Sequence, residues 1–270
     1  MSDSIIENVR LVKPRVHCIT NYITANDCAN ILLACGASPI MADCPDESAE
    51  ITSLCSALVI NLGTPNTQRL EAMLISGKKA NELGIPVVFD PVGTGASCFR
   101  TDFALKLLSE VRLSIIRGNL SEIRSLAGTS SNQHGVDTTD IITDASIQSA
   151  AELARELSLK TGAVIAITGE TDIVADSSSA YCIHNGHMIM SSITGCGCML
   201  SALMGAFSAV SEDILKAATE AVTAIDVCGE TAARQLLPHE GNISCRNRLI
   251  DAVYRLNKEA LTSSAIIEKL

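Results

Sequence analysis

The segment Ser191-Ser192-Ile193-Thr194-Gly195-Cys196-Gly197-Cys198-Met199-Leu200 joins two apolar stretches of the chain. Residues 188–190 before it predict a short buried strand. Residues 199–210 after it predict a helix, because they are mostly small, apolar and free of proline. The glycines between them allow a tight turn and a close approach of the backbone to a ligand.

The start of this expected helix is suited to binding an anion. Its first backbone amides have no partners within the helix and lie at the positive end of the helix dipole. Cys198 falls in the first turn, where we expect the thiol to ionise more readily. This arrangement fits phosphate chemistry, but glycines at such a joint also serve the turn alone, and cysteine is a common small core residue. The sequence has no Walker-type G-x-x-x-x-G-K-[ST] motif, so a phosphate would not be held in a P-loop.

Apolar strands and helices alternate along the rest of the chain. We expect strands at residues 38–42, 57–61, 85–90, 113–116 and 163–168, and helices at 24–35, 67–83, 102–111, 144–160, 212–235 and 245–262. Apolar, β-branched runs between helices predict an α/β fold, with a mostly parallel sheet covered by helices on both faces.

The pattern changes after residue 168. Residues 180–183 and 187–190 flank His184-Asn185-Gly186, and an Asn-Gly pair is typical of a tight hairpin turn, so we expect an antiparallel edge hairpin there. No repeat or linker divides the chain, which predicts one domain over residues 1–270. The polar stretch 128–140 is the expected mobile surface loop.

Composition excludes several classes of partner. The formal net charge is -10 and aromatic residues make up only 3%, which argues against nucleic acids and anionic membranes as ligands. The cysteine count, 11, is odd, and no C-x-x-C motif occurs, so we expect reduced thiols in a cytoplasmic protein rather than a disulfide scaffold. No signal peptide pattern or membrane-spanning apolar run is present.

Polar residues lie at the carboxyl ends of the expected strands, which is where α/β sheets bind their ligands. These residues are Asn61, Asp90, Arg117, Thr168 and Thr194. An arginine at a strand end can neutralise phosphate oxygens. The shared position of these side chains beside the proposed anion site favours a functional role for the group.

Two carboxylates are candidate Mg²⁺ ligands. Asp90 begins the glycine-rich loop 90–96, and Glu122 lies in the pattern Asn119-x-x-Glu122. That pattern fits a helix cap and a Mg²⁺ water shell about equally well. His184-x-x-His187 and Cys196-x-Cys198 lack further ligands in sequence, so we interpret the histidines as surface residues and expect no soft-metal site.

Several motifs are spread over most of the chain: Val16-His17-Cys18-Ile19-Thr20-Asn21, Ala37-Ser38-Pro39-Ile40-Met41-Ala42, Asn61-Leu62-Gly63-Thr64, Asp90-Pro91-Val92-Gly93 with Ala96 and Arg100, Arg117-Gly118-Asn119-x-x-Glu122, Ala166-Ile167-Thr168-Gly169, Asn185-Gly186-His187 and Thr194-Gly195-Cys196-Gly197-Cys198. With these motifs in this order, the chain closely resembles the hydroxyethylthiazole kinases, which belong to the ribokinase-like superfamily.

The resemblance implies a ribokinase-like fold and an ATP-dependent, Mg²⁺-requiring phosphorylation of the primary alcohol of 4-methyl-5-(2-hydroxyethyl)thiazole. The product would be the thiazole phosphate used in thiamine diphosphate biosynthesis. The resemblance also implies a homotrimer with thiazole sites between subunits. The residue roles that it implies are Met41, Gly195 and Asn21 for the thiazole, Arg117, Thr168, Thr194 and Gly197 for ATP, Asp90 and Glu122 for Mg²⁺, and Cys198 at the position where most ribokinase-like kinases carry an aspartate base.

One residue departs from the family pattern. Cys196 stands where the family usually has threonine, and this change should leave an anion site built from backbone amides largely intact. Three other functions compete with the one implied: a hydroxymethylpyrimidine kinase, an ADP-forming dehydratase of the same superfamily, and a thiazole-binding sensor without turnover. The motifs around Asn21 and Met41 argue against the first, and the set Asp90, Arg117, Glu122 and Cys198 argues against the sensor.

Overall fold

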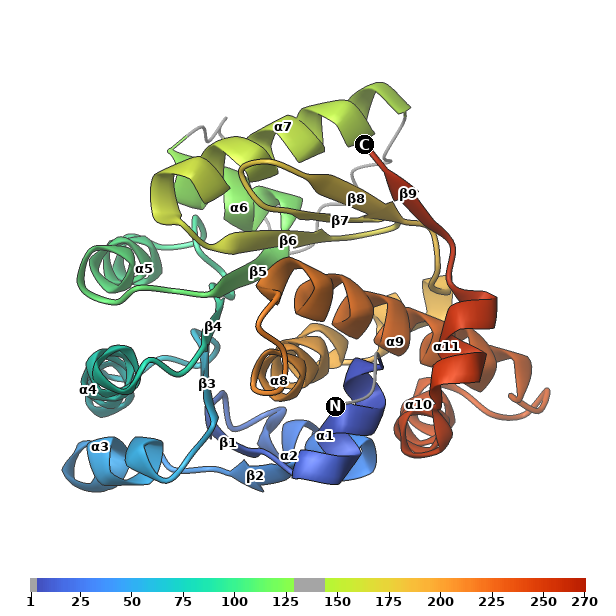
Figure 1. The fold of residues 1–270 in the computed structure, drawn as a ribbon, viewed down its shortest axis with the longest axis horizontal. Helices are drawn as coiled ribbons and strands as arrows, with labels where there is room; N and C mark the ends of the chain where they lie inside the picture. The colour runs from blue at the N-terminus through green and yellow to red at the C-terminus, as the bar shows by residue number, and fades with distance from the viewer. Residues whose placement is uncertain (1–3, 129–143) are drawn as a thin grey trace.

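The computed structural model describes residues 4–128 and 144–270, in which helices and strands alternate for most of the chain (Figure 1). The strands are β1 (Arg15–Ile19), β2 (Ser38–Ile40), β3 (Ala57–Asn61), β4 (Val87–Asp90), β5 (Ile115–Asn119), β6 (Val164–Thr168), β7 (Asp172–Ala175), β8 (Ala180–Ile183) and β9 (Ile267–Lys269). The helices are α1 (Ile5–Val12), α2 (Ala25–Cys35), α3 (Pro45–Ser53), α4 (Thr67–Leu83), α5 (Cys98–Glu110), α6 (Leu120–Ala127), α7 (Asp144–Thr161), α8 (Cys196–Ser208), α9 (Ile214–Arg234), α10 (Asn242–Arg255) and α11 (Lys258–Ser264).

The described strands form one sheet in the order β2-β1-β3-β4-β5-β6-β7-β8-β9. Strands β1 to β6 pair in parallel, and β7, β8 and β9 continue the sheet in antiparallel pairs. This confirms the predicted α/β class, with a mostly parallel sheet and an antiparallel edge.

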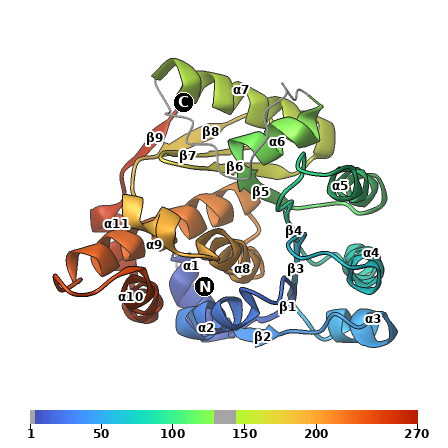
Figure 2. The same ribbon diagram turned by 180° about the vertical axis from the view of Figure 1, so that it is seen from behind.

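Helices cover both faces of the sheet. Figures 1 and 2 show α3, α4 and α5 on one face and α2, α8 and α9 on the other. The continuous apolar sequence of β3 follows from this: Ala57 and Val59 enter one core, while Leu58 and Ile60 enter the other. Strand β3 is therefore buried on both sides.

The chain reverses its direction across the sheet next to β1. It runs from β1 outward to β2 and then returns to β3 on the opposite side of β1. In open α/β sheets the crevice at such a reversal, outside the carboxyl ends of the strands, is the usual ligand site. Asn21 follows the end of β1, and Asn61 ends β3.

The predicted edge hairpin is wrong in its location. The Asn185 side chain is bonded to distant groups instead: Nδ2 donates to Glu230 and to the Ser264 carbonyl, and Oδ1 accepts from the Ile266 amide. These contacts lead the chain away from β8, whose antiparallel partners are β7 and β9.

The predicted buried strand at residues 188–190 is also wrong. Met188–Ser192 form a 3₁₀ helix with no buried residue. Met190 packs against Gly229 of α9, where any larger side chain would overlap its sulfur.

Other boundaries differ in smaller ways. The predicted helix 245–262 is two helices, because Leu256 is extended and the Asn257 side chain caps α11. Gly128 ends α6 in a left-handed conformation. The remainder of the predicted loop 128–140 lies outside the described residues.

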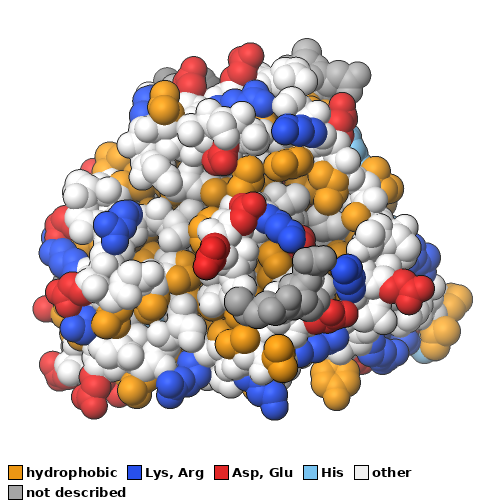
Figure 3. Space-filling model, in the orientation of Figure 1, with side chains coloured by type: hydrophobic (Ala, Val, Ile, Leu, Met, Phe, Trp, Pro, Cys, Tyr) orange, Lys and Arg blue, Asp and Glu red, His pale blue; other side chains and the backbone are white. Residues whose placement is uncertain are grey.

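None of the helices in the described parts of the chain combines the length and the apolar character needed to cross a membrane. Figure 3 shows acidic, basic and apolar side chains interspersed on the face viewed in Figure 1.

Candidate active site

The turn before α8 presents its backbone much as predicted, although the helix begins at Cys196 rather than at residue 199. Gly195 has a positive φ of 86°, a conformation that other residues rarely adopt, and a Cβ there would meet the Thr24 side chain at 2.5 Å. A Cβ on Gly197 would overlap the guanidinium of Arg117. Gly195 therefore lets the turn pack against Thr24, and Gly197 lets the first turn of α8 lie against Arg117.

Thr194 precedes this turn and is exposed. Its predicted place at a strand end is wrong, because the segment before it is the 3₁₀ helix rather than a strand.

Asp90 ends β4, and Arg117 faces it from the neighbouring parallel strand β5. The predicted strand end at Arg117 is wrong by two residues, because β5 continues to Asn119. Asp90 is fully buried, and its Oδ2 accepts hydrogen bonds from Asn61 Nδ2 and Ser201 Oγ, both at 2.8 Å. Its other oxygen, Oδ1, lies 3.6 Å from Arg117 Nη1 and has no hydrogen-bond partner among the described residues. Burial raises the pKa of Asp90, and the neighbouring Arg117 partly opposes that shift.

Arg117 is itself only partly bonded. Its Nη2 donates to Thr168 Oγ1 at 2.6 Å, which joins the ends of β5 and β6. Within the described part of the chain, its buried Nε has no acceptor. The Asp90–Arg117 pair thus leaves one carboxylate oxygen and one guanidinium N–H, both buried, without hydrogen-bond partners among the described residues.

Glu122 closes the side of the site formed by the loop after β4. Its Oε2 accepts from the Asn119 amide at 2.9 Å, and its Oε1 accepts from the Gly93 amide at 2.8 Å. The capping alternative for Asn119-x-x-Glu122 is therefore realised, and the same carboxylate also holds the glycine-rich loop. Burial and the nearby Asp90 raise the pKa of Glu122.

Cys198 lies in the first turn of α8, with its sulfur beside Asn21, which follows β1, and Asn61, which ends β3. Asn61 Nδ2 lies 3.3 Å from its Sγ, and Asn21 Nδ2 lies 3.4 Å from it. Burial, followed by the charge of Asp90, raises the pKa of the thiol. The expectation that this thiol ionises more readily is wrong for the free protein, because burial and a nearby carboxylate outweigh the helix terminus.

Two of the residues implied for the thiazole, Asn21 and Met41, lie along the β1–β2 side of this edge, and the third, Gly195, precedes α8. Asn21 is buried, whereas Met41 follows β2 and is 39% exposed. Next to Asn21, Tyr22 is 72% exposed and Ile23 is 60% exposed.

Sequence reasoning missed a second buried carboxyl pair near Arg117. Asp172 begins β7, Asp226 lies on α9, and their two carboxyl groups lie close enough to influence each other's pKa. Burial, and then the charge of Asp172, raise the pKa of Asp226 well above its usual range. Nothing in the sequence signals this pair, because its members are far apart in the chain. Ser201 was also missed. It lies one helical turn after Gly197, whose carbonyl oxygen is 3.2 Å from the Ser201 hydroxyl, and that hydroxyl donates to Asp90 at the shorter distance.

The histidine interpretation holds: His184 and His187 are exposed, and His184 Nε2 lies 3.3 Å from Glu268 Oε2. In residues 4–128 and 144–270, no group of three or more His, Cys, Asp or Glu side chains is placed to hold a metal ion by itself.

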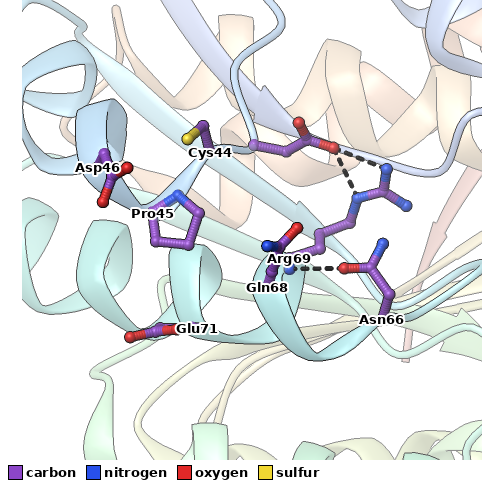
Figure 4. A pocket seen from close by; sticks show the side chains of 8 residues that line it. Cys44, Pro45, Asp46, Asn66, Gln68, Arg69 and Glu71 are labelled. Carbon is purple, nitrogen blue, oxygen red and sulfur yellow. Dashed lines mark hydrogen bonds and ion pairs between the residues drawn. The ribbon is translucent and has the colours of Figure 1, made fainter.

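A hollow of about 350 Å³ lies between the starts of α3 and α4 (Figure 4). Its lining begins at Asp43, two residues after Met41 in the sequence. Its lining includes Asp43, Asn66, Arg69 and Glu71. Both Nε and Nη2 of Arg69 donate to Asp43 Oδ2, at 2.9 and 2.7 Å, and Asn66 caps α4. None of the site residues predicted from the sequence lines this hollow.

The chain resembles known proteins over nearly its whole length. The family model described as the hydroxyethylthiazole kinase family matches residues 6–259. The hydroxyethylthiazole kinase of Clostridium acetobutylicum is 50% identical over 266 residues, which cover 97% of this chain and 97% of that protein.

Solved structures agree with this match. The structure of the hydroxyethylthiazole kinase protein from Pyrococcus horikoshii OT3 has a TM-score of 0.88 at 35% identity, and the alignment covers 98% of this chain and 97% of that one. A ribokinase-like superfamily protein from Enterococcus faecalis V583 shares the fold, with a TM-score of 0.62 at 12% identity, over 94% of this chain and 90% of that one.

Proposed function

The chain belongs to the hydroxyethylthiazole kinase family, and on this basis we propose that it transfers the γ-phosphoryl group of ATP to the primary alcohol of 4-methyl-5-(2-hydroxyethyl)thiazole. The observation that carries the proposal is the Asp90–Arg117 pair. It lies against the first turn of α8 and retains unmet hydrogen-bonding groups, Asp90 Oδ1 and Arg117 Nε, among the described residues.

Binding and neutralisation of phosphate supply most of the rate in this proposal. The transition state of phosphoryl transfer is loose, so positioning and charge stabilisation matter more than a strong base. The amides of Gly195 to Cys198 and the guanidinium of Arg117 face the transferred group. Thr168 orients Arg117 through its hydroxyl. Thr168, Thr194 and Gly197 contact ATP.

Asp90 and Glu122 would hold Mg²⁺, and the donor set fits it. Mg²⁺ keeps most of its waters and is bound through one or two carboxylates, and Asp90 Oδ1 is a buried carboxylate oxygen without a hydrogen-bond donor in the described residues. Glu122 keeps lone pairs on both oxygens beyond its two backbone bonds. When bound, Mg²⁺ neutralises charge on the phosphate oxygens.

Cys198 has a modest role in this scheme. Its raised pKa keeps the thiol protonated in the free protein, and a thiol is a mediocre base for an alcohol. We assign it to contact with the alcohol. Only its thiolate form, which the thiol reaches by releasing its own proton to solvent, accepts the alcohol proton late in the transfer. A Cys198→Asp enzyme no faster than Cys198→Ala would count against any base at this position.

The thiazole would lie against Met41, Gly195 and Asn21. We propose a homotrimer in which a neighbouring subunit completes this site, and the exposed apolar side chains of Tyr22 and Ile23 beside Asn21 support an interface there. The 11 cysteines are free, which supports a reducing compartment, the cytoplasm.

A coupled ADP-release assay with the thiazole alcohol tests the function. We expect ADP and the thiazole phosphate in equal amounts, with hydroxymethylpyrimidine a poor substrate. ADP release without a phosphorylated alcohol would instead support the dehydratase. Binding of the thiazole without ADP release would support the sensor.

A further inference from the structure

Two buried asparagines meet where the chain reverses direction between β1 and β3. Asn61 ends β3 and is fully buried, while Asn21 follows β1 and is 5% exposed. Asn21 Nδ2 donates to Asn61 Oδ1 at 3.1 Å, so the two amides form a direct pair.

Backbone contacts fix which way both amides point. Asn21 Oδ1 accepts from the amides of Ile23 and Thr24, at 3.2 and 3.1 Å. Asn61 Oδ1 accepts from the Gly63 amide at 2.9 Å, in addition to the bond from Asn21. Because each carbonyl oxygen is held by backbone N–H groups, each NH₂ group must face the opposite way.

The two NH₂ groups converge on the Cys198 sulfur. Asn61 Nδ2 uses one hydrogen for Asp90 Oδ2, at 2.8 Å, and the other for Cys198 Sγ, at 3.3 Å. Asn21 Nδ2 likewise divides its hydrogens between Asn61 and Cys198 Sγ. All four N–H bonds are thereby used, and the sulfur is the acceptor of two of them.

Resting on the proposed function, we propose that Asn61 is a positioning residue for phosphoryl transfer, which holds the Cys198 sulfur as a hydrogen-bond acceptor facing the substrate alcohol. Its bond to Asp90 keeps the amide in that orientation. Four other titratable or charged groups lie near the sulfur: Asp90 on β4, Arg117 on β5, Cys28 on α2 and Cys196 on α8.

The position of Gly63 offers a way to disturb this pair without removing a donor. A Cβ on Gly63 would lie 2.8 Å from Asn61 Oδ1 and 2.9 Å from Asn21 Nδ2. Gly63→Ala therefore pushes on both amides while it keeps their chemistry. Asn66→Ala is a matched control, because Asn66 also follows β3 but only caps α4.

The first test is a double-mutant cycle between Asn61→Ala and Cys198→Ala. In the Cys198 background we expect kcat to fall by about tenfold to a hundredfold, with a much smaller change in the KM for the alcohol. In the Cys198→Ala background, Asn61→Ala should reduce kcat by a clearly smaller factor, because the sulfur that Asn61 positions is gone. Gly63→Ala should show the same dependence on Cys198, and Asn66→Ala should leave kcat unchanged. Equal losses in both backgrounds would overturn the proposal.

The second test needs no turnover, so it separates this inference from the proposed function. The alkylation rate of Cys198 by iodoacetamide is measured at one fixed pH by peptide mass spectrometry. N–H donors stabilise a thiolate, so Asn61→Leu, which fills the space without donating, should slow the reaction by about threefold or more. Unchanged alkylation in both Asn61→Leu and Gly63→Ala would contradict the positioning role, whatever the wild-type ADP assay shows.

Discussion

Two aspartate–arginine pairs lie at the carboxyl edge of the sheet, and they differ in how completely they are bonded. Arg69 donates twice to Asp43 (Figure 4). It also donates to the Thr64 carbonyl at 3.0 Å. Arg117 approaches Asp90 only to 3.6 Å, and across the described residues its Nε and Asp90 Oδ1 have no hydrogen-bond partners.

The difference separates a structural pair from a functional one. A buried polar group without a partner costs about 1–3 kcal/mol, so a fold retains such groups where a ligand completes them. Arg69 has little capacity left for a ligand, and it ties the loop after β2 to α4. Asp90 and Arg117 keep that capacity, and they do so beside the amides of α8.

The largest expected effect is on Arg117→Met. We expect kcat/KM for ATP to fall by about 10²–10³-fold, because a fixed cation facing the transferred phosphate is lost. Steady-state ADP release checks this. A variant with near wild-type kcat/KM would show that the open pair is not the phosphate site.

Gly197→Ala should have an effect of intermediate size. The new methyl group would displace the Arg117 guanidinium, so we expect kcat/KM for ATP to fall by about tenfold. Gly241→Ala is the control, because no described atom lies within 4 Å of its added Cβ. Equal behaviour of the two variants would argue against close contact between Gly197 and Arg117.

Asp226→Asn tests the second carboxyl pair through stability. The pKa of Asp226 is raised in the folded state. Between the ordinary pKa of an unfolded aspartate and this raised pKa, the folded protein holds a proton that the unfolded chain has lost. The free energy of unfolding therefore declines as the pH rises through this range. The variant removes this decline while its amide can donate to Asp172. We expect it to be more stable than wild type by about 1–3 kcal/mol at neutral pH, with the gain shrinking toward about pH 4. Urea unfolding across pH measures the gain, and a gain independent of pH would contradict the buried proton.

Arg69→Met should have the smallest effect, and only on stability. Asp43 is half exposed, so we expect a loss of about 1 kcal/mol in the free energy of unfolding. Its kcat/KM for ATP should match wild type in the same ADP assay. A large loss of activity would remove the distinction between the two pairs.

The fold was predictable where local signals and burial agree. The predicted limits of β3 and α4 match the structure, since the apolar run of β3 ends at a polar residue and Gly84 ends α4 in a left-handed conformation. The hairpin failed because the Asn-Gly signal is local, whereas Asn185 is bound to Glu230 and Ser264, which are 45 and 79 residues away.

The sequence predicted which residues meet in the site, but not the electrostatics of the site. The rule that ligands lie at strand ends grouped Asn61, Asp90, Arg117 and Thr168, and the structure brings these side chains together. The direction of the Cys198 pKa could not be predicted, because it depends on burial and on a carboxylate from another strand.

The most direct test of the distinction between the two pairs is a crystal structure of this protein with Mg²⁺ and a non-hydrolysable ATP analogue. We predict that the terminal phosphates contact Arg117 and the first amides of α8, while Arg69 stays bonded to Asp43. Phosphates bound at Arg69, with Arg117 still held only by Thr168 and Asp90, would contradict the account.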